Sequence, residues 1–183
     1  MNMKYKLRRL AVVAAIVGIA ALVAFVLPSV DTGRIERALG MVEVYRDLGG
    51  NEYDSPYDAL VALFPGDEYA FVFLTLWSAD CPACRDQLAV FKEFGEKTDG
   101  LIGFLALNIG DSPQRVAEVA AKMSLPFPIL TGMKRAPEGV RGVPHTTLMF
   151  WNSETHKWEG LASKMGLVTE EQLIEAITIA MQE

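Results

Sequence analysis

The longest apolar run of the chain extends from Leu10 to Leu27, with no polar side chain in 18 residues. As a helix rising 1.5 Å per residue, this run would be about 27 Å long, close to the thickness of a bilayer core. The residues before it include four basic and no acidic side chains, namely Lys4, Lys6, Arg8 and Arg9. Because basic flanks stay on the cytoplasmic side, the pattern predicts a single-pass anchor that sends the C-terminal part outward.

A cleaved signal peptide is the alternative interpretation of this run. The apolar part of a signal peptide is usually shorter and is followed by a small-x-small cleavage site. The sequence from Phe25 to Ser29 offers no such site, so we favour an uncleaved anchor. The expected organisation is a cytoplasmic basic segment 1–9, a transmembrane signal anchor 10–27, a juxtamembrane helical segment 28–63 and an exported domain 64–183.

Two helices are predicted in the juxtamembrane segment. Ile35, Leu39, Val42 and Tyr45 recur at helical spacing and predict a helix within residues 31–48. The glycines that follow at positions 49 and 50 end this helix. A serine and a proline at positions 55 and 56 are typical of a helix start and predict a second helix through residue 64.

From residue 69 onward, the pattern is that of strands alternating with helices. Residues 69–77 are almost continuously apolar, which is typical of a strand covered on both faces. The elements expected next are a helix over 85–97, a strand over 101–107 and a helix over 113–123 that is capped by the pair Ser112-Pro113. They are followed by a short strand over 125–130, a loop over 131–143, a hairpin of strands 146–151 and 157–162, and a helix from the capping box Thr169-x-x-Gln172 to residue 181. This order predicts an α/β domain whose central mixed sheet has parallel crossovers first and an antiparallel hairpin last.

Charge argues against one class of partner. The formal charge of the chain is −6, and removing the four basic residues that precede the apolar run leaves about −10 for the remainder. An acidic exported domain gives no reason to expect binding of nucleic acid. Residues 31–183 are enough for one ordinary domain.

The chain has only two cysteines, Cys81 and Cys84, directly behind the strand predicted to end at Trp77. Cysteines this close can close only a small ring, which is a poor structural staple but a good reversible dithiol. At the start of a helix, Cys81 would meet unsatisfied backbone N–H groups and the positive end of the helix dipole. Both favour the thiolate, which is the nucleophile in disulfide exchange. An exported domain also lies where disulfides form and persist.

A zinc site, a structural disulfide and two inert cysteines are the alternatives. Structural zinc takes four ligands, and only His145 and His156 remain to complete a set with the two cysteines. The strand–helix context of the motif therefore favours redox chemistry, and we expect no bound metal.

Three separated features carry a resemblance to a known family. They are Trp77-x-x-x-Cys81-x-x-Cys84, the segment Leu125-Pro126-Phe127-Pro128 and the sequence Gly142-Val143-Pro144 before the hairpin. Over roughly residues 64–182 the chain resembles the thioredoxin superfamily, and within it the membrane-anchored TlpA/ResA group of thiol–disulfide oxidoreductases. The resemblance implies a thioredoxin-like fold behind the N-terminal transmembrane helix. It also implies that the Val143–Pro144 peptide is cis and faces the dithiol, that Cys81 is the exposed attacking thiol and Cys84 the buried resolving thiol, and that Trp77 shields the pair.

The sequence departs from the family pattern near the motif. Asp80 stands where many relatives have a tryptophan, and its charge opposes a neighbouring thiolate, whereas Arg85 favours it. Thr75 stands where thioredoxin has a buried acid, which leaves the proton acceptor for Cys84 open. Pro82 lies beside the first cysteine, as in more oxidising relatives, so the motif does not fix the direction of electron flow.

His145 directly follows Pro144 and has two interpretations. Close to the dithiol, its imidazolium would stabilise the Cys81 thiolate. Alternatively, it is a strand histidine whose ring points away from the sulfurs. His156 falls in the predicted hairpin turn, and we expect it to be solvated.

These observations predict a membrane-tethered, outward-facing thiol–disulfide oxidoreductase that needs no cofactor. The resemblance favours reduction of disulfides in exported proteins, for example in cytochrome c maturation, with a membrane thiol carrier as the electron donor. A disulfide-forming oxidase of the same fold is one alternative. A second is a tethered chaperone for a soft metal such as copper, held by Cys81, Cys84 and His145. A third is a non-catalytic assembly subunit with an unreactive dithiol.

Overall fold

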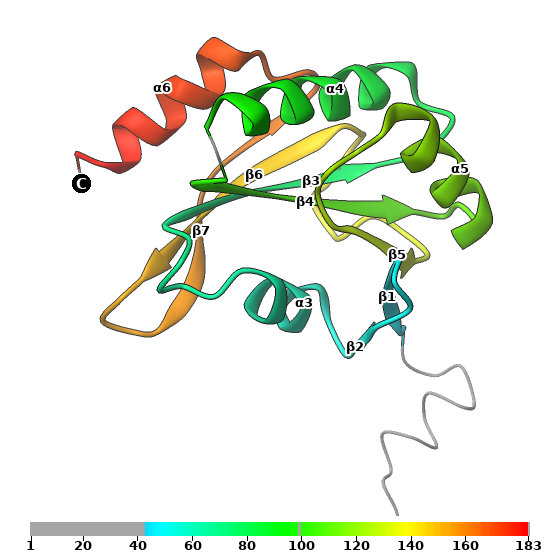
Figure 1. Ribbon diagram of the computed structural model, residues 1–183, viewed down its shortest axis with the longest axis horizontal. Helices are drawn as coiled ribbons and strands as arrows, with labels where there is room; N and C mark the ends of the chain where they lie inside the picture. Colours follow the sequence, from blue (N-terminus) through cyan, green and yellow to red (C-terminus); the bar gives the residue numbers. More distant parts are fainter. Residues whose placement is uncertain (1–42, 99, 183) are drawn as a thin grey trace, which may run out of the picture. The chain divides into compact units, whose positions relative to one another are not determined.

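The structure is a computed structural model, and it describes residues 43–98 and 100–182 (Figure 1). The predicted cytoplasmic segment 1–9, the predicted anchor 10–27 and most of the predicted helix 31–48 lie outside the described residues. Among the described helices, none combines the length and the apolar character that a bilayer-spanning segment requires.

Within the described residues, seven strands form one sheet in the order β2-β1-β5-β4-β3-β6-β7. The strands are β1 (Tyr45–Asp47), β2 (Glu52–Tyr53), β3 (Phe71–Trp77), β4 (Ile102–Ile109), β5 (Ile129–Met133), β6 (His145–Asn152) and β7 (Lys157–Met165). The helices are α3 (Pro56–Leu63), α4 (Pro82–Lys97), α5 (Pro113–Met123) and α6 (Glu170–Ala180). Strands β3, β4 and β5 pair in parallel, and β6 pairs antiparallel with β3 and β7. The predicted order of parallel crossovers followed by an antiparallel hairpin is confirmed.

Helices cover both faces of the sheet, with α4 and α6 on one side and α3 on the other (Figure 1). Alternate side chains of a strand face opposite sides. In β3, Phe73 packs against Phe91 of α4, whereas Leu76 packs in the cluster that includes Leu60 of α3. The apolar run of β3 is continuous because both of its faces are buried in this way.

Three of the helix starts follow the predicted caps. The hydroxyl oxygen of Ser55 accepts a hydrogen bond from the backbone N–H of Asp58 at 3.1 Å, and that of Ser112 accepts from Arg115 at 3.3 Å. Before α6, the backbone N–H of Thr169 donates to the Gln172 side-chain oxygen at 3.2 Å. Helix α4 starts at Pro82, three residues earlier than predicted, because Cys81 itself is its N-cap.

The predicted helix 31–48 is wrong over its described part. Residues Tyr45–Asp47 form strand β1, which pairs antiparallel with β5 and β2, and Tyr45 is buried in the core. Strand β1 pairs with the edge of β5, and the hydrogen bonds of this pairing favour a strand over the helix that the spacing of the apolar residues predicted. The juxtamembrane segment predicted up to residue 63 therefore supplies two strands to the sheet as well as helix α3.

The strand predicted over residues 125–130 begins four residues later than predicted, at Ile129, and ends at Met133. Pro126 and Pro128 have no N–H to donate to a β-ladder, so regular pairing with β4 begins only after them. Residues 131–133, predicted as loop, belong to this strand. Strands β6 and β7 extend further than predicted, with an irregularity in their pairing between Leu148 and Met149.

Candidate active site

Cys81 and Cys84 form a disulfide at the N-terminus of α4, with their Cα atoms 5.2 Å apart. The backbone N–H of Cys84 donates to the Cys81 Sγ at 3.1 Å, so the sulfur occupies the position of a helix-capping acceptor. Cys81 is partly exposed, whereas Cys84 is fully buried with 0% exposure. Cys81 is therefore more accessible to solvent than Cys84, as the resemblance implied.

The segment that leads into β6 lies against the dithiol. The Val143–Pro144 peptide is cis, as predicted, and Pro144 is buried. The Cys81 Sγ lies 3.7 Å from the carbonyl oxygen of Val143. Residues 81–84 and 143–144, which are far apart in the sequence, thus border one site.

Trp77 lies on the buried side of the pair. It has 0% exposure and packs in one cluster with Cys84, Leu88 and Val116. Its indole Nε1 has no hydrogen-bond partner among the described residues. Trp77 is therefore a core residue in the apolar cluster that also contains the inner cysteine.

Thr75 is also buried with 0% exposure, two residues before Trp77 on the same face of β3. The hydroxyl of Thr146 donates to the Thr75 hydroxyl oxygen at 3.2 Å. The strand position that the sequence analysis compared with the buried acid of thioredoxin therefore carries a pair of hydroxyls. Neither hydroxyl is a strong base.

The strand register places His145 opposite Leu76, while its neighbour Thr146 lies opposite Thr75. Directly paired residues share a face of the sheet. His145 thus shares a face with Leu76, which packs in the α3-side cluster, and not with Trp77, which packs with Cys84. The imidazole Nδ1 is buried without a hydrogen-bond partner among the described residues. This register favours the interpretation in which the ring points away from the sulfurs.

Polar side chains that the sequence analysis did not single out hold the two residues before Cys81. The carboxylate of Asp111, in the loop after β4, accepts from the backbone N–H of Ala79 at 2.7 Å. Arg115 of α5 forms an ion pair with Asp80 at 3.2 Å. The hydrogen bond and the charge of Asp80 raise the pKa of the Arg115 guanidinium. The parallel strands β3 and β4 end at the same edge of the sheet. The position of Asp111 shortly after a predicted strand therefore could have indicated that it lies near the cysteine motif.

The described residues contain no group of three or more histidine, cysteine, aspartate or glutamate side chains arranged to hold a metal ion. The donor set proposed for a soft-metal chaperone was Cys81, Cys84 and His145. The register of His145 does not bring that set together.

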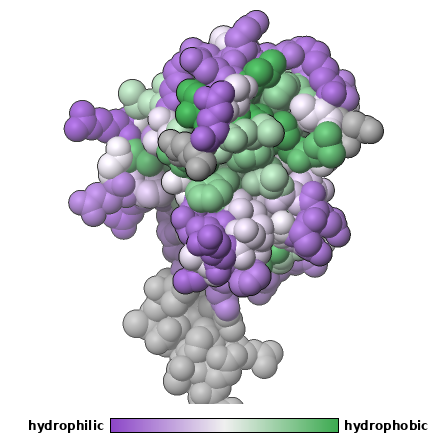
Figure 2. Space-filling view, turned by 90° about the vertical axis from the view of Figure 1, so that its left-hand side faces the viewer, coloured by the Kyte–Doolittle hydropathy of each residue, from purple (hydrophilic) through white to green (hydrophobic). Residues whose placement is uncertain are grey.

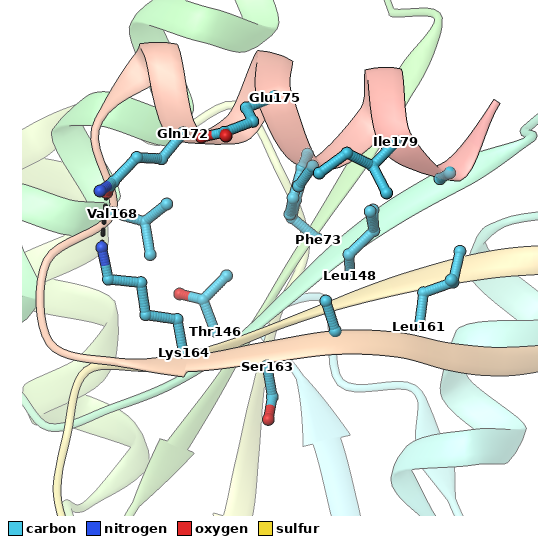
Figure 3. A pocket seen from close by; sticks show the side chains of 13 residues that line it. Phe73, Thr146, Leu148, Leu161, Ser163, Lys164, Val168, Gln172, Glu175 and Ile179 are labelled. Carbon is cyan, nitrogen blue, oxygen red and sulfur yellow. Dashed lines mark hydrogen bonds between the residues drawn. The ribbon is translucent and has the colours of Figure 1, made fainter. Parts of the chain in front are cut away.

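A separate cavity of about 350 Å³ lies between α6 and the hairpin of β6 and β7 (Figure 3). Phe73, Leu148 and Val168 line its apolar part, and Lys164 donates a hydrogen bond to the Gln172 side-chain oxygen at 2.7 Å at its edge. Figure 2 shows apolar side chains gathered on the side of the domain that lies to the left in Figure 1. Neither cysteine lines this cavity.

The sheet order, the helices on both faces and the disulfide at the start of α4 together define a thioredoxin-like fold. No protein-family model matches the sequence. No curated protein matches it. The fold matches StoA from Bacillus subtilis at 21% identity and a TM-score of 0.50, over 73% of this chain and 94% of that one.

Two further solved structures share the fold. A secreted Mycobacterium tuberculosis disulfide oxidoreductase homologous to E. coli DsbE matches at 14% identity and a TM-score of 0.51, over 74% of this chain and 94% of that one. A thioredoxin-family thiol:disulfide interchange protein from Chlorobium tepidum matches at 11% identity and a TM-score of 0.53, over 76% of this chain and 94% of that one. These likenesses confirm the thioredoxin-like fold that the sequence predicted.

Proposed function

We propose that this protein is a thiol–disulfide oxidoreductase that cycles between a Cys81–Cys84 disulfide and a dithiol. One observation carries the proposal: a partly exposed Cys81 caps a helix, and its disulfide partner one turn later is fully buried. A purely structural crosslink would not require this difference in access. Two of the solved structures that share the fold are described as a disulfide oxidoreductase and a thiol:disulfide interchange protein, which supports the same chemistry here.

In the reducing direction, the reaction has two exchange steps. The Cys81 thiolate attacks one sulfur of a substrate disulfide, a bond forms between them, and the other substrate sulfur leaves as a thiolate that takes up a proton. Cys84 then loses its proton and attacks the Cys81 Sγ. The Cys81–Cys84 disulfide forms, and the second substrate thiolate is released. Two electrons pass from the protein dithiol to the substrate.

The geometry of the pair supports a different role for each cysteine. The Cys84 backbone N–H that reaches the Cys81 Sγ at 3.1 Å would stabilise a thiolate there, together with the positive end of the α4 dipole. Burial of Cys84 disfavours its charged form and keeps it from competing for substrate. We therefore assign attack to Cys81 and resolution to Cys84.

We further propose that the domain is tethered through residues 10–27 and faces the periplasmic or extracytoplasmic side. The basic flank before the apolar run supports this topology, and the related Mycobacterium tuberculosis structure is described as secreted. The partners would be disulfide-containing exported proteins, the lipid bilayer and a membrane thiol carrier that donates electrons. Recovery of a soluble exported form starting near Ser29 would contradict the tether.

Trapping of the mixed disulfide tests the proposed chemistry. Cys84→Ser removes the resolving thiol, so the first exchange step should leave substrate attached to Cys81. Cys81→Ser is the matched control and should trap nothing. Both variants are expressed in cells, and disulfide-linked complexes are detected as reductant-sensitive bands. Absence of complexes with Cys84→Ser would contradict the oxidoreductase role.

A further inference from the structure

The peptide groups of Ala79 are held by two side chains of opposite charge. Ala79 is fully buried, two residues before Cys81, and belongs to no helix or strand. Its N–H donates to the Asp111 Oδ2 at 2.7 Å, and its carbonyl oxygen accepts from the Arg85 Nη1 at 2.8 Å. A buried backbone N–H or C=O group without a hydrogen-bond partner is unfavourable. These two side chains provide the partners that a neighbouring strand or a helical turn would otherwise provide.

Asp111 is itself held in place by hydrogen bonds with Asn108. The side-chain Nδ2 of Asn108, at the end of β4, donates to the same Asp111 Oδ2 at 2.8 Å. The backbone N–H of Asp111 donates back to the Asn108 Oδ1 at 3.2 Å. Asn108 is buried with 1% exposure. The carboxylate is therefore held in one orientation by the strand next to β3.

Arg85 approaches Ala79 from the helix that carries the dithiol. Its backbone N–H donates to the Cys81 carbonyl oxygen at 3.3 Å, and its guanidinium reaches back past Cys81 to Ala79. The backbone N–H of Cys81 donates to the Ser78 carbonyl oxygen at 3.2 Å, which closes the turn. Cys81 thus lies between Ala79 and Arg85, which are linked by the hydrogen bond from the guanidinium to the carbonyl oxygen.

We propose that Asp111 and Arg85 are positioning residues that fix the two peptide groups flanking Ala79 and thereby keep the Cys81 sulfur in place for attack. The inference rests on the proposed function, because positioning of this sulfur is useful only if it reacts. One negative and one positive side chain hold the two peptide groups that flank Ala79, so together the two side chains add no net charge. We call this arrangement the Ala79 clamp.

Two substitutions of Asp111 separate geometry from charge. Asp111→Ala and Asp111→Asn remove the same negative charge, but only asparagine keeps an oxygen that can accept from both the Ala79 N–H and Asn108. Asp86→Asn removes a negative charge from an exposed position on α4 that the clamp does not use. The measurement is the rate of alkylation of Cys81 by iodoacetamide across a pH series, in the full chain with detergent present and the dithiol reduced.

The clamp predicts that Asp111→Ala slows alkylation by about tenfold, because small displacements of a reacting group have large effects on rate. Asp111→Asn should keep at least about a third of the rate, and Asp86→Asn should behave like the unmodified protein. Arg85→Ala should also slow the reaction, and its effect combined with that of Asp111→Ala should be less than additive, since both side chains hold the backbone of one residue, Ala79. Equal loss in Asp111→Ala and Asp111→Asn, or no loss in either, would overturn the clamp.

A measurement on the unmodified chain covers the case in which Asp111→Ala fails to fold. The Ala79 amide proton should exchange with deuterium far more slowly than the amide proton of Gly139, an exposed residue between β5 and β6. Equally fast exchange of the two would also overturn the clamp. Neither readout needs a substrate. If the unmodified protein exchanges no disulfide while the variants follow the predicted order, the proposed function fails and the clamp stands.

Discussion

Cys81 and Cys84 lie one helical turn apart, yet the fold exposes the first in part and buries the second. The local sequence explains the exposed position, since a cysteine before a proline at a helix start becomes the N-cap. Burial of Cys84 comes in part from residues distant in the sequence, among them Val116 and Ile129. Their difference in access is thus a property of the packed domain and not of the motif alone.

His145 provides a prediction at the same scale. Because the register puts it on the α3 side of the sheet, His145→Ala should leave the pH dependence of Cys81 alkylation unchanged. His156→Ala, in the hairpin turn, is the matched control for loss of a histidine. The measurement is alkylation rate against pH for the reduced proteins. A profile that moves for His145→Ala alone would restore the interpretation in which the imidazolium stabilises the thiolate.

The reactive residues could be predicted from the sequence, but the contacts that position them could not be predicted equally well. The two cysteines and the Val143–Pro144 peptide follow from short motifs. The contact between Asp111 and Ala79 joins residues 32 positions apart, and it depends on the order of the strands. The sequence marks Asp111 only by its place shortly after a predicted strand, and it does not identify Ala79 as the partner.

Among the elements, the turn between β1 and β2 depends on one carboxylate. Asp47 accepts from the backbone N–H of Asn51 at 2.9 Å, from the Asn51 side chain at 2.8 Å and from the Tyr53 hydroxyl at 3.1 Å. Burial acts to raise the pKa of Asp47, but the hydrogen bonds from Asn51 and Tyr53 outweigh it and lower that pKa below its ordinary value. The ionised form therefore stabilises the folded state.

A carboxylate whose pKa is lowered by folding stabilises the folded protein at pH values above the pKa that it has in the unfolded chain. This stabilisation is lost as the pH falls through the pKa of the folded state. Asp47→Asn should therefore lower the free energy of unfolding at pH 7 by about 1 kcal/mol, and the difference should shrink below about pH 4. Denaturant unfolding at both pH values measures it. Asp67→Asn, in an exposed turn, is the control. A difference of the same size at both pH values would contradict this role of Asp47.

The elements that the sequence predicted correctly have a strong local signal. Helix α3 begins after Ser55 and α5 after Ser112, as their serine–proline pairs predicted. Strand β1 has no such signal, since its three residues are fixed by pairing with β5, more than 80 positions later. Pairing with this distant strand therefore determines the structure at Tyr45, although Tyr45 is the last residue of an apolar pattern with helical spacing.

At the scale of the whole domain, α3 and the dithiol lie on opposite faces of the sheet. Trp158 of β7 connects the sheet to the α3 side, where its buried Nε1 donates to the Phe64 carbonyl oxygen at 3.1 Å. Trp158→Phe leaves that buried carbonyl without its donor. The free energy of unfolding should fall by about 1–3 kcal/mol, whereas the alkylation rate of Cys81 should not change. Denaturant unfolding and alkylation of the same variant measure both, and a slower alkylation would show that α3 supports the site.

Equilibration of the full chain with glutathione redox buffers shows whether Cys81 and Cys84 form a redox pair. The fraction of reduced protein is read by alkylation and mass. We expect one reversible two-electron transition at a potential above about −300 mV, the region of labile and catalytic disulfides. A disulfide that stays oxidised below that potential would be a structural crosslink and would contradict the account.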